Sequence, residues 1–363
     1  MSPRMRTTTV GAVGEAVDPA PRVRSMRSRM DKLQRENERL KLRLGDQERF
    51  YDSLRDCIKM LPTPRLERLQ KPKLSHAESG AVLSISDVHA EEYVDLEEME
   101  GFASYDWETF LCRMWWTANK TVELTNIMRQ SGEVNNLDIL LLGDMLTGEI
   151  HLDLLRTNTF DLPMAVVNTG YVLAQTVSVL SGHFSNVKVT GVCGNHGRQD
   201  EKPAAKNKSD RNWDTAVYKI AALLTADNPR VTWNIPRSPA TIVKVPGASI
   251  LAKHGDGIKM QGTKPYYGLA RDTAQEHAKR RGKNDFDWVF QGHLHTFDKL
   301  EERVLCPSMI GTNQYAFNRL HSVPKPQQLL VFANDKRGLT NFWPISLEDA
   351  CDHGFKAMPK FVA

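Results

Sequence analysis

The sequence lacks a set of cysteines that could pair. Its five cysteines are odd in number, and no two stand at C-x-x-C spacing: Cys57, Cys112, Cys193, Cys306 and Cys351. A disulfide framework or a zinc knuckle is therefore not expected. A reducing, cytoplasmic compartment is the setting that this cysteine usage favours.

Long apolar runs and a strong charge of one sign are missing as well. No run approaches the ~18 apolar residues of a membrane-spanning helix, so no membrane association is expected. The Arg-rich N-terminus has no apolar core of a secretory signal. The 363 residues carry a net charge of only +4, so charge alone does not indicate a nucleic-acid binder. Their ordinary composition allows one large α/β domain with an appendage.

The N-terminal part has a pattern of its own. Residues 1–24 show no periodicity and predict a flexible tail. Residues 25–61 carry a heptad seam with steps of four and three: Met26, Met30, Leu33, Asn37, Leu40, Leu44, Tyr51, Leu54, Ile58 and Leu61, with Gln47 in the one gap. This pattern fits a coiled coil that joins copies of the chain into a homo-oligomer, with Asn37 fixing the register of a parallel pair. It also fits an amphipathic helix packed on its own domain.

The remainder of the chain indicates an α/β sheet protein. Pro62 and Pro64 end the predicted helix, and residues 62–79 are predicted to be a linker. From 80 to 345, short apolar runs alternate with helical patterns near 107–130, 161–182 and 212–226. The apolar runs are Ala81–Ile85, Ile139–Leu142, Val187–Val192, Ser249–Ala252 and Trp288–Phe290. We predict one domain over 80–345 and a C-terminal tail over 346–363.

A polar cluster follows each of the five apolar runs. In chain order the clusters are Ser86-Asp87-Val88-His89, Gly143-Asp144, Gly194-Asn195-His196, His254-Gly255-Asp256 and Gly292-His293-Leu294-His295. Ligands of open α/β sheets bind outside the carboxyl ends of the strands, so these clusters are expected to converge. A single histidine after an apolar run is more often structural, but five clusters together indicate one site.

The residue types select metal chemistry. Imidazole and carboxylate groups without a thiolate suit first-row divalent ions such as Mn, Fe or Zn. Seven ligating side chains are too many for one ion and suit two. A pair of ions can clamp the attacking and leaving oxygens of a phosphoryl displacement. The glycines beside Asp144, Asn195 and His293 allow the backbone to turn sharply and approach the ions.

The five blocks D-x-H, G-D, G-N-H, H-G-D and G-H-x-H resemble, in this order, the calcineurin-like metallophosphoesterase superfamily. The resemblance covers residues 80 to 345 and implies an α/β fold of four layers, α/β/β/α. The coiled-coil helix that the heptad pattern predicts would precede this fold. It also implies a role for each ligand. Asp87, His89 and His295 would hold the first metal, Asn195, His254 and His293 the second, and Asp144 would bridge the two. His196 would lie over the phosphate and act on charge or on the leaving group as a general acid.

Two departures narrow the resemblance. Ser/Thr protein phosphatases carry an acidic residue after the G-N-H block and an Arg-Gly pair after the G-D block. This chain has Gly197-Arg198 and Met145-Leu146-Thr147-Gly148 there, which argues against a protein phosphatase. The stretches 143–151 and 194–198 look more like metallophosphoesterases encoded by bacteriophages, related at a distance to DNA-repair nuclease subunits.

Several residues near the blocks are candidates for substrate contacts. The predicted catalytic residues are His196, Asp144 and Arg198. Arg198 is expected either to contact phosphate or to form a salt bridge at a helix start. The basic stretches 198–211 and 277–283 favour an anionic substrate, unless they are solvated surface charges. The other candidates are His151 close behind the ligands, His183 as a satisfied loop histidine, and Asn313, Tyr315, Phe317 and Arg319 as a wall of the cleft or as core and rim.

The sequence therefore predicts a phosphoester hydrolase that depends on two divalent ions, with manganese the expected activator in vitro. The first candidate is a phosphodiesterase or nuclease that acts on DNA or RNA. An alternative is a small-substrate phosphatase or a cyclic-nucleotide phosphodiesterase. A third is a coiled-coil scaffold with a vestigial metal site, although a decayed site is expected to have lost at least one ligand.

Overall fold

The computed structural model describes residues 20–60, 79–150, 157–200, 202–203, 205–258 and 266–353. The chain divides into two units, residues 1–55 and 56–363, which are described separately. The predicted tail from 1 to 19 and the predicted linker from 62 to 78 lie outside the described residues. Residues 354–363 of the predicted C-terminal tail do so as well.

The N-terminal unit contains most of one long helix. Helix α1 runs over 41 residues, Ala20–Met60. It begins five residues before the predicted start at 25. Pro21 lies in its first turn, where a proline costs no hydrogen bond because the first N–H groups of a helix have no partner inside it.

Four parallel strands and two antiparallel ones form the larger sheet. Its strand order is β11-β10-β1-β2-β3-β4. The strands are β1 (Ser79–Ile85), β2 (Val134–Leu141), β3 (Asn186–Gly191), β4 (Val231–Asn234), β10 (Gln327–Asn334) and β11 (Gly338–Ser346). Strands β1 to β4 are parallel, and β10 joins β1 in antiparallel register.

The smaller sheet has five strands in the order β5-β6-β7-β9-β8. They are β5 (Ala240–Val245), β6 (Ala248–Lys253), β7 (Trp288–Gln291), β8 (Asp298–Lys299) and β9 (Arg303–Leu305). Strands β6, β7 and β9 are parallel, and β5 and β8 are antiparallel edge strands. The five apolar runs of the sequence thus correspond to β1, β2, β3, β6 and β7.

One apolar core joins the two sheets. Val82 and Leu140 from the larger sheet are buried in the same cluster as Ile250 and Phe290 from the smaller one. The buried face explains why β1 is a continuous apolar run, since a parallel strand covered on both sides has no solvent face. Removing this surface from water is the main stabilising contribution to the domain.

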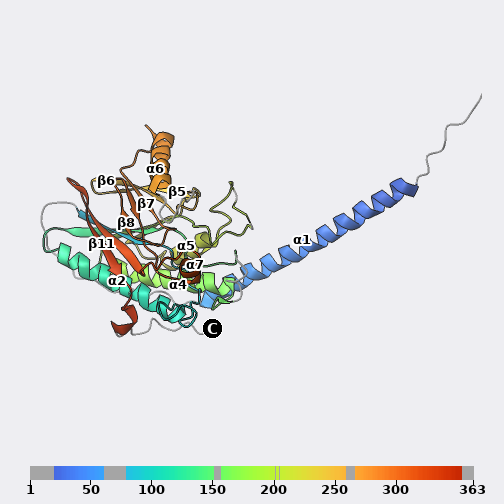
Figure 1. Cartoon of the computed structure of the whole chain (residues 1–363), viewed down its shortest axis with the longest axis horizontal. Coiled ribbons are helices and arrows are strands. Elements are labelled where there is room, and N and C mark those ends of the chain that lie inside the picture. Colours follow the sequence, from blue (N-terminus) through green and yellow to red (C-terminus); the bar gives the residue numbers. More distant parts are fainter. Residues whose placement is uncertain are drawn as a thin grey trace, which may run out of the picture. The chain divides into compact units, whose positions relative to one another are not determined.

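Helices lie on both sides of the pair of sheets in this domain. They are α2 (Trp107–Met128), α4 (Leu162–Ser181), α5 (Trp213–Leu224), α6 (Tyr266–Arg280), the short α7 (Gln314–Asn318) and the 3-10 turn η1 (Ala350–His353). In Figure 1, α2 and α4 lie on one side of the sheets and α6 on the other. The three predicted helices agree with α2, α4 and α5. Each begins after a side chain that caps its first turn, Asp106, Asp161 and Asn212.

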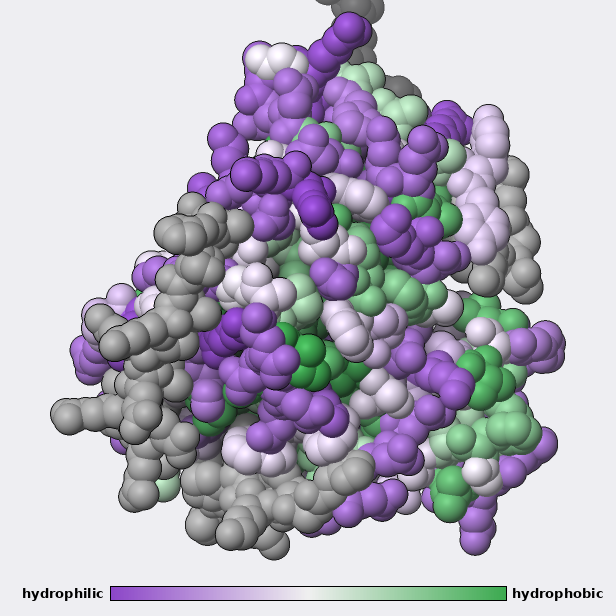
Figure 2. Space-filling view, turned by 90° about the vertical axis from the view of Figure 1, so that its left-hand side faces the viewer, coloured by the Kyte–Doolittle hydropathy of each residue, from purple (hydrophilic) through white to green (hydrophobic). Residues whose placement is uncertain are grey.

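Helix α4 is the one described helix that is long and apolar enough to span a membrane by length and composition. Its 20 residues are apolar enough to do so, but 83% of its most apolar window is buried inside the domain. It is therefore a core helix. Figure 2 shows one face of the molecule, on which hydrophilic residues predominate and apolar residues gather in small areas within the coloured part.

Candidate metal centre

The predicted ligands follow the carboxyl ends of five parallel strands. Strands β1, β2 and β3 of the larger sheet lead into the blocks that contain Asp87, Asp144 and Asn195. Strands β6 and β7 of the smaller sheet lead into His254 and His293. Because the two sheets pack face to face through one core, the five strand ends meet at one edge of the domain.

Three groups of side chains at this edge are close enough to hold metal ions. Within each group the ligand atoms lie within 4.8 Å of one another. The first group is Asp87, His89 and His295, the second is Asp144, His254 and His293, and the third is His89, Asp144 and His196. Six of the seven predicted ligands thus occur in these groups, and Asn195 contacts the second group through His254.

The first group is built around Asp87. Its Oδ1 lies 3.4 Å from Nε2 of His295, and both its oxygens accept the backbone N–H of His293 at 3.0 Å. Burial alone would raise the pKa of Asp87, but the hydrogen bond and charge of His295 outweigh it and lower that pKa to about 2. Asp87 is therefore an ionised, oriented carboxylate.

His89 supplies a test of whether a cation fits this group. Its Nδ1 lies 3.4 Å from the Thr147 hydroxyl and 3.7 Å from a carboxylate oxygen of Glu92. Its Nε2 is buried and has no hydrogen-bond partner among the residues that the structure describes. A buried ring nitrogen without a partner is costly in an apo protein and is satisfied by a bound metal.

The second group also has an arrangement that suits a bound cation. His254 donates its Nδ1–H to the Leu142 carbonyl at 2.8 Å. Its Nε2 lies 3.0 Å from Oδ1 of Asn195 and 3.0 Å from Oδ2 of Asp144. Three electron-pair donors thus face one another, and a cation between them would relieve their repulsion. Imidazole, carboxylate and amide oxygen suit first-row divalent ions.

The pKa shifts of the two histidines in the second group also favour a bound cation. Burial lowers the pKa of His254, but the negative charge of Asp144 raises it to about 10, so a proton is strongly attracted to the position. The neighbouring His293 responds in the opposite direction. Burial and then the positive charge of His254 lower the pKa of His293 to about 4. His293 is thus a neutral imidazole, the form that binds metal.

Asp144 lies between the two sides of the centre. Its Oδ2 faces His254, and its Oδ1 accepts the backbone N–H of His196 at 2.8 Å. It is a member of two of the three groups, as a bridging ligand has to be.

His196 is held in place by a hydrogen bond from its Nδ1. Its Nδ1 lies 2.9 Å from the Thr147 carbonyl, so this nitrogen carries the donated proton. Its ring meets that of His89 edge to face with centroids 4.8 Å apart. Proton exchange is left to Nε2. Because His196 also belongs to a group with His89 and Asp144, its position allows both an acid–base role and metal ligation.

The backbone at the ligands is strained. Asp87, His89, Asp144, His293 and His295 have φ values of 50°, 50°, 52°, 71° and 56°. Such left-handed conformations cost of order 1–3 kcal/mol each in a residue with a side chain, and they persist only where the surroundings impose them. Here the N–H groups of Val88 and His89 both donate to the carbonyl of Asp144, which locks two ligand loops together.

Two glycines beside the ligands are required by close approach. A Cβ on Gly194 would overlap the carboxylate and backbone of Asp144, and one on Gly292 would overlap Ser86 and Asp87. The close approach of the backbone to these side chains therefore requires glycine at both positions.

Arg198 lies beside the second group. It is half-buried, and its guanidinium donates to the Asn195 carbonyl at 3.0 Å. A small hollow next to it is lined by Asn195, Arg198, Asp200, Pro203, Lys208, Arg211 and Asp256. The predicted phosphate contact of Arg198 thus has a suitable location next to a ligand.

Basic residues of both stretches form pairs with acidic side chains. Lys208 pairs with Asp256 at 2.7 Å, and Arg211 pairs with Asp200 at 2.7 Å. At the end of α6, His277 lies 3.1 Å from Glu302. Lys279 and Arg280 pair with Glu276. These pairs favour the interpretation of 277–283 as a charged helix end, while Lys202 and Lys206 stay exposed in the first stretch.

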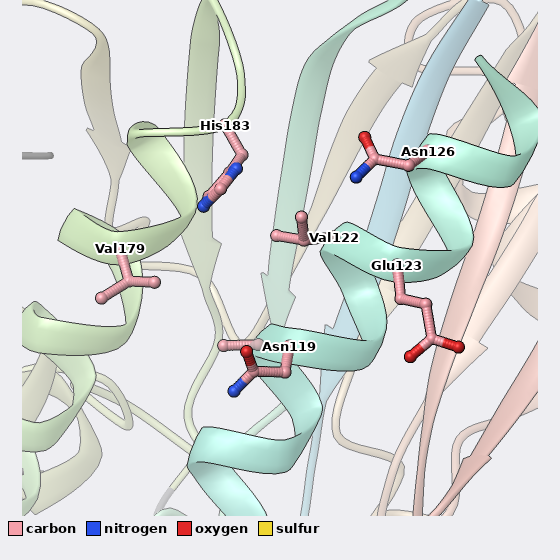
Figure 3. Close-up of a pocket in the computed structure, with 7 residues that line it drawn as sticks. Asn119, Val122, Glu123, Asn126, Val179 and His183 are labelled. Carbon is pink, nitrogen blue, oxygen red and sulfur yellow. The ribbon is translucent and has the colours of Figure 1, made fainter. Parts of the chain in front are cut away.

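The other residues that the sequence suggested for substrate contacts are not among the three groups of candidate ligands. His151 lies outside the described residues. His183 is apart from the metal centre and lines a hollow of ≈ 360 Å³ with residues of α2 and α4, among them Asn119 and Glu123 (Figure 3). Tyr315 and Arg319 are exposed, and Phe317 packs against Phe102 with ring centroids 5.4 Å apart, as rim residues do.

Asn313 contacts the network behind the first group. Its amide donates to Glu92 at 2.8 Å, and Glu92 in turn accepts the Thr147 hydroxyl at 3.2 Å. Sequence reasoning missed Glu92, which is buried next to His89. A carboxylate behind a ligating histidine orients its ring. The only sequence signal was an acidic pair shortly after the D-x-H block.

Asp214 is the second residue that sequence reasoning missed. It lies in the first turn of α5, is fully buried, and accepts three backbone N–H groups, from Asp144 at 3.0 Å, Met145 at 3.0 Å and Gly194 at 2.8 Å. One carboxylate thus ties the G-D loop to the G-N-H loop. No motif surrounds it in the sequence.

Comparison with known proteins finds no matching family model and no matching curated protein. Solved structures with some likeness include the Zn²⁺ complex of Vps29 from Entamoeba histolytica. It is 12% identical, with 74% of this chain and 99% of that chain covered and a TM-score of 0.29.

Two further structures are a predicted phosphoesterase from Streptococcus pneumoniae and a phosphopantetheinyl hydrolase from Mycobacterium tuberculosis. The first is 10% identical, covering 74% and 99% of the two chains, with a TM-score of 0.29. The second is 11% identical, covering 66% and 93%, with a TM-score of 0.27. Because these TM-scores are below 0.5, we draw no inference from them, and the proposals below rest on the side chains of this chain.

Proposed function

We propose that the chain is a phosphoester hydrolase that depends on two divalent metal ions, built on the four-layer fold of the calcineurin-like metallophosphoesterases. The observation that carries the proposal is that Asp144 and His89 each belong to two of the three groups of side chains. Within each group the ligand atoms lie within 4.8 Å of one another. Asp87, His89 and His295 would hold one ion and Asn195, His254 and His293 the other, with Asp144 between them. Two such ions supply positive charge to the attacking and leaving oxygens of a phosphoryl displacement.

The protein's own groups would do the rest. His196 is fixed by the Thr147 carbonyl, so its Nε2 is the atom that gives a proton to the leaving oxygen or stabilises charge there. Arg198, held by the Asn195 carbonyl, is placed to neutralise a phosphate oxygen. Asp214 and the strained loops keep the ligands in position before substrate arrives.

For the substrate we propose a phosphodiester, DNA or RNA in the first instance. The exposed Lys202 and Lys206, on the same stretch as Arg198, support an anionic substrate of some length. The sequence resemblance to bacteriophage metallophosphoesterases and, at a distance, to repair nucleases supports the same class.

A small phosphate ester is the second candidate, for a specific reason. The segment after Glu92 carries the half-buried Asp95 and the exposed Glu97 and Glu98, whose charges would repel a long polyanion. The Lys208–Asp256 and Arg211–Asp200 pairs also reduce the positive charge next to the centre. A vestigial site on a scaffold is the least supported, because all seven predicted ligand side chains are present. Six of them occur in the three groups of close ligand atoms, and Asn195 contacts His254.

The test uses the chain loaded with Mn²⁺. Hydrolysis of bis-p-nitrophenyl phosphate, p-nitrophenyl phosphate, and labelled single- and double-stranded DNA and RNA would be measured side by side. Asp144→Asn, purified identically, controls for contaminating nucleases. Cleavage of nucleic acid by the wild type alone supports a nuclease. Activity on small esters alone selects the second candidate, and no metal-dependent hydrolysis of any of them overturns the proposal.

A further inference from the structure

Helix α1 presents a row of large apolar side chains to solvent. Met30, Leu33, Leu40 and Tyr51 are 60%, 64%, 53% and 52% exposed. A row of this kind on a helix is a surface that is expected to be covered by a partner. The exposed row ends with Tyr51.

The spacing of this row assigns heptad positions. Met30, Asn37 and Tyr51 occupy a positions, and Leu33 and Leu40 occupy d positions. An a/d seam that keeps a seven-residue repeat fits another helix with the same repeat. The chain itself supplies such a helix in a second copy.

Flanking charges select the orientation of that copy. In a parallel, in-register pair, each g residue faces the e residue five positions later on the other helix. The g residue Glu36 then faces the partner's Lys41, and both types of side chain are exposed on α1. This contact joins opposite charges, and twofold symmetry repeats it.

Asn37 points to the same arrangement. In a parallel pair an a residue meets its own counterpart, so the Asn37 amides can hydrogen-bond to each other in an otherwise apolar seam. In an antiparallel pair an a residue meets a d residue. The alignment that gives Asn37 a polar counterpart, Gln47, brings Lys41 close to the partner's Lys41. Only the parallel register satisfies the amide and the charges together.

We propose that residues 26–51 of α1 form a parallel, two-stranded coiled coil with a second copy of this chain. The pairing makes the protein a homodimer in which both chains enter their large domains from the same end of the coil. This proposal does not depend on the proposed hydrolase activity.

Sedimentation equilibrium of the full chain tests the stoichiometry. The expected mass is twice the 41.1 kDa of one chain. Glu36→Lys replaces two attractive contacts per dimer with two repulsive ones, and it is expected to weaken dimerisation about 10-fold. Glu38→Lys makes the same charge change at an outward b position and is expected to leave the mass unchanged. A monomer or a trimer, or equal effects of the two variants, overturns the proposal.

Charge exchange and a cysteine test the orientation. Lys41→Glu is expected to weaken its own dimer, whereas a mixture of the Glu36→Lys and Lys41→Glu chains forms a heterodimer. Leu33→Cys places two thiols in one d layer of a parallel pair, so oxidised glutathione should link the chains quantitatively, with the wild type as background. Failure to link while the chain remains a dimer overturns the parallel arrangement.

Discussion

Replacing Asp214 by asparagine removes a charge that the metal centre needs without changing side-chain size. The Asp214 carboxylate accepts the N–H groups of Asp144, Met145 and Gly194. An asparagine oxygen in the place of Oδ2 can keep the bonds to Asp144 and Gly194. The amide nitrogen would then face the N–H of Met145, donor against donor.

The expected loss of stability follows from the number of hydrogen bonds that the substitution removes. One hydrogen bond to a charged group is lost, which costs about 1.5–3 kcal/mol. Part of this loss is offset, because burial and the neighbouring charge of Asp144 raise the pKa of Asp214 to about 6, so its ionised form is already disfavoured. We expect a net loss of about 1–2 kcal/mol in the free energy of unfolding. Since both ligand loops are loosened, metal affinity should fall about 10- to 100-fold.

Calorimetric titration of the metal-free protein with Mn²⁺ measures the affinity, and thermal unfolding measures the stability. Asp210→Asn is the matched control, because Asp210 is exposed and pairs with Arg237 at the surface. Metal affinity of Asp214→Asn equal to that of the control would refute the reasoning that this carboxylate holds the centre together.

Two further predictions concern His196 and Asp138. His196→Ala should retain both ions but lower the rate on a small diester by ~10²–10⁴, the range for a positioned acid; loss of metal would instead make His196 a ligand. Burial raises the pKa of Asp138 to about 6, above its ordinary 3.8. The folded state therefore binds this proton more tightly, and stability falls as pH rises from about 4 to 6. Asp138→Asn should unfold like the wild type at pH 4 and be more stable by about 1–3 kcal/mol at pH 8 in thermal melts; equal stability at pH 8 contradicts this.

Much of the site could be predicted because its chemistry follows strand ends. Apolar runs mark β1, β2, β3, β6 and β7, and the residues that follow a parallel strand are bound to meet at one edge. Candidate ligands such as Asp87 and His295 can therefore be paired without a structure, although 208 positions separate them in the numbering.

The supporting residues could not be predicted in the same way. Asp214 follows the helix cap Asn212, and nothing in that local pattern shows that its carboxylate reaches two other loops. Glu92 lies 3.7 Å from the ring of His89, and this contact likewise depends on the tertiary structure. The left-handed backbone at Asp87 and His89 runs against the intrinsic preference of both residues, so only the packed structure can impose it.

The metal content of the chain tests the central claim most directly. Wild type and Asp144→Asn would be loaded with Mn²⁺, desalted and analysed by elemental mass spectrometry with protein quantified in the same sample. We predict two ions per wild-type chain and a loss of both from Asp144→Asn, because its carboxylate lies between the two sides of the centre. Fewer than one ion per wild-type chain, or an unchanged content in the variant, would contradict a centre of two metals joined through Asp144.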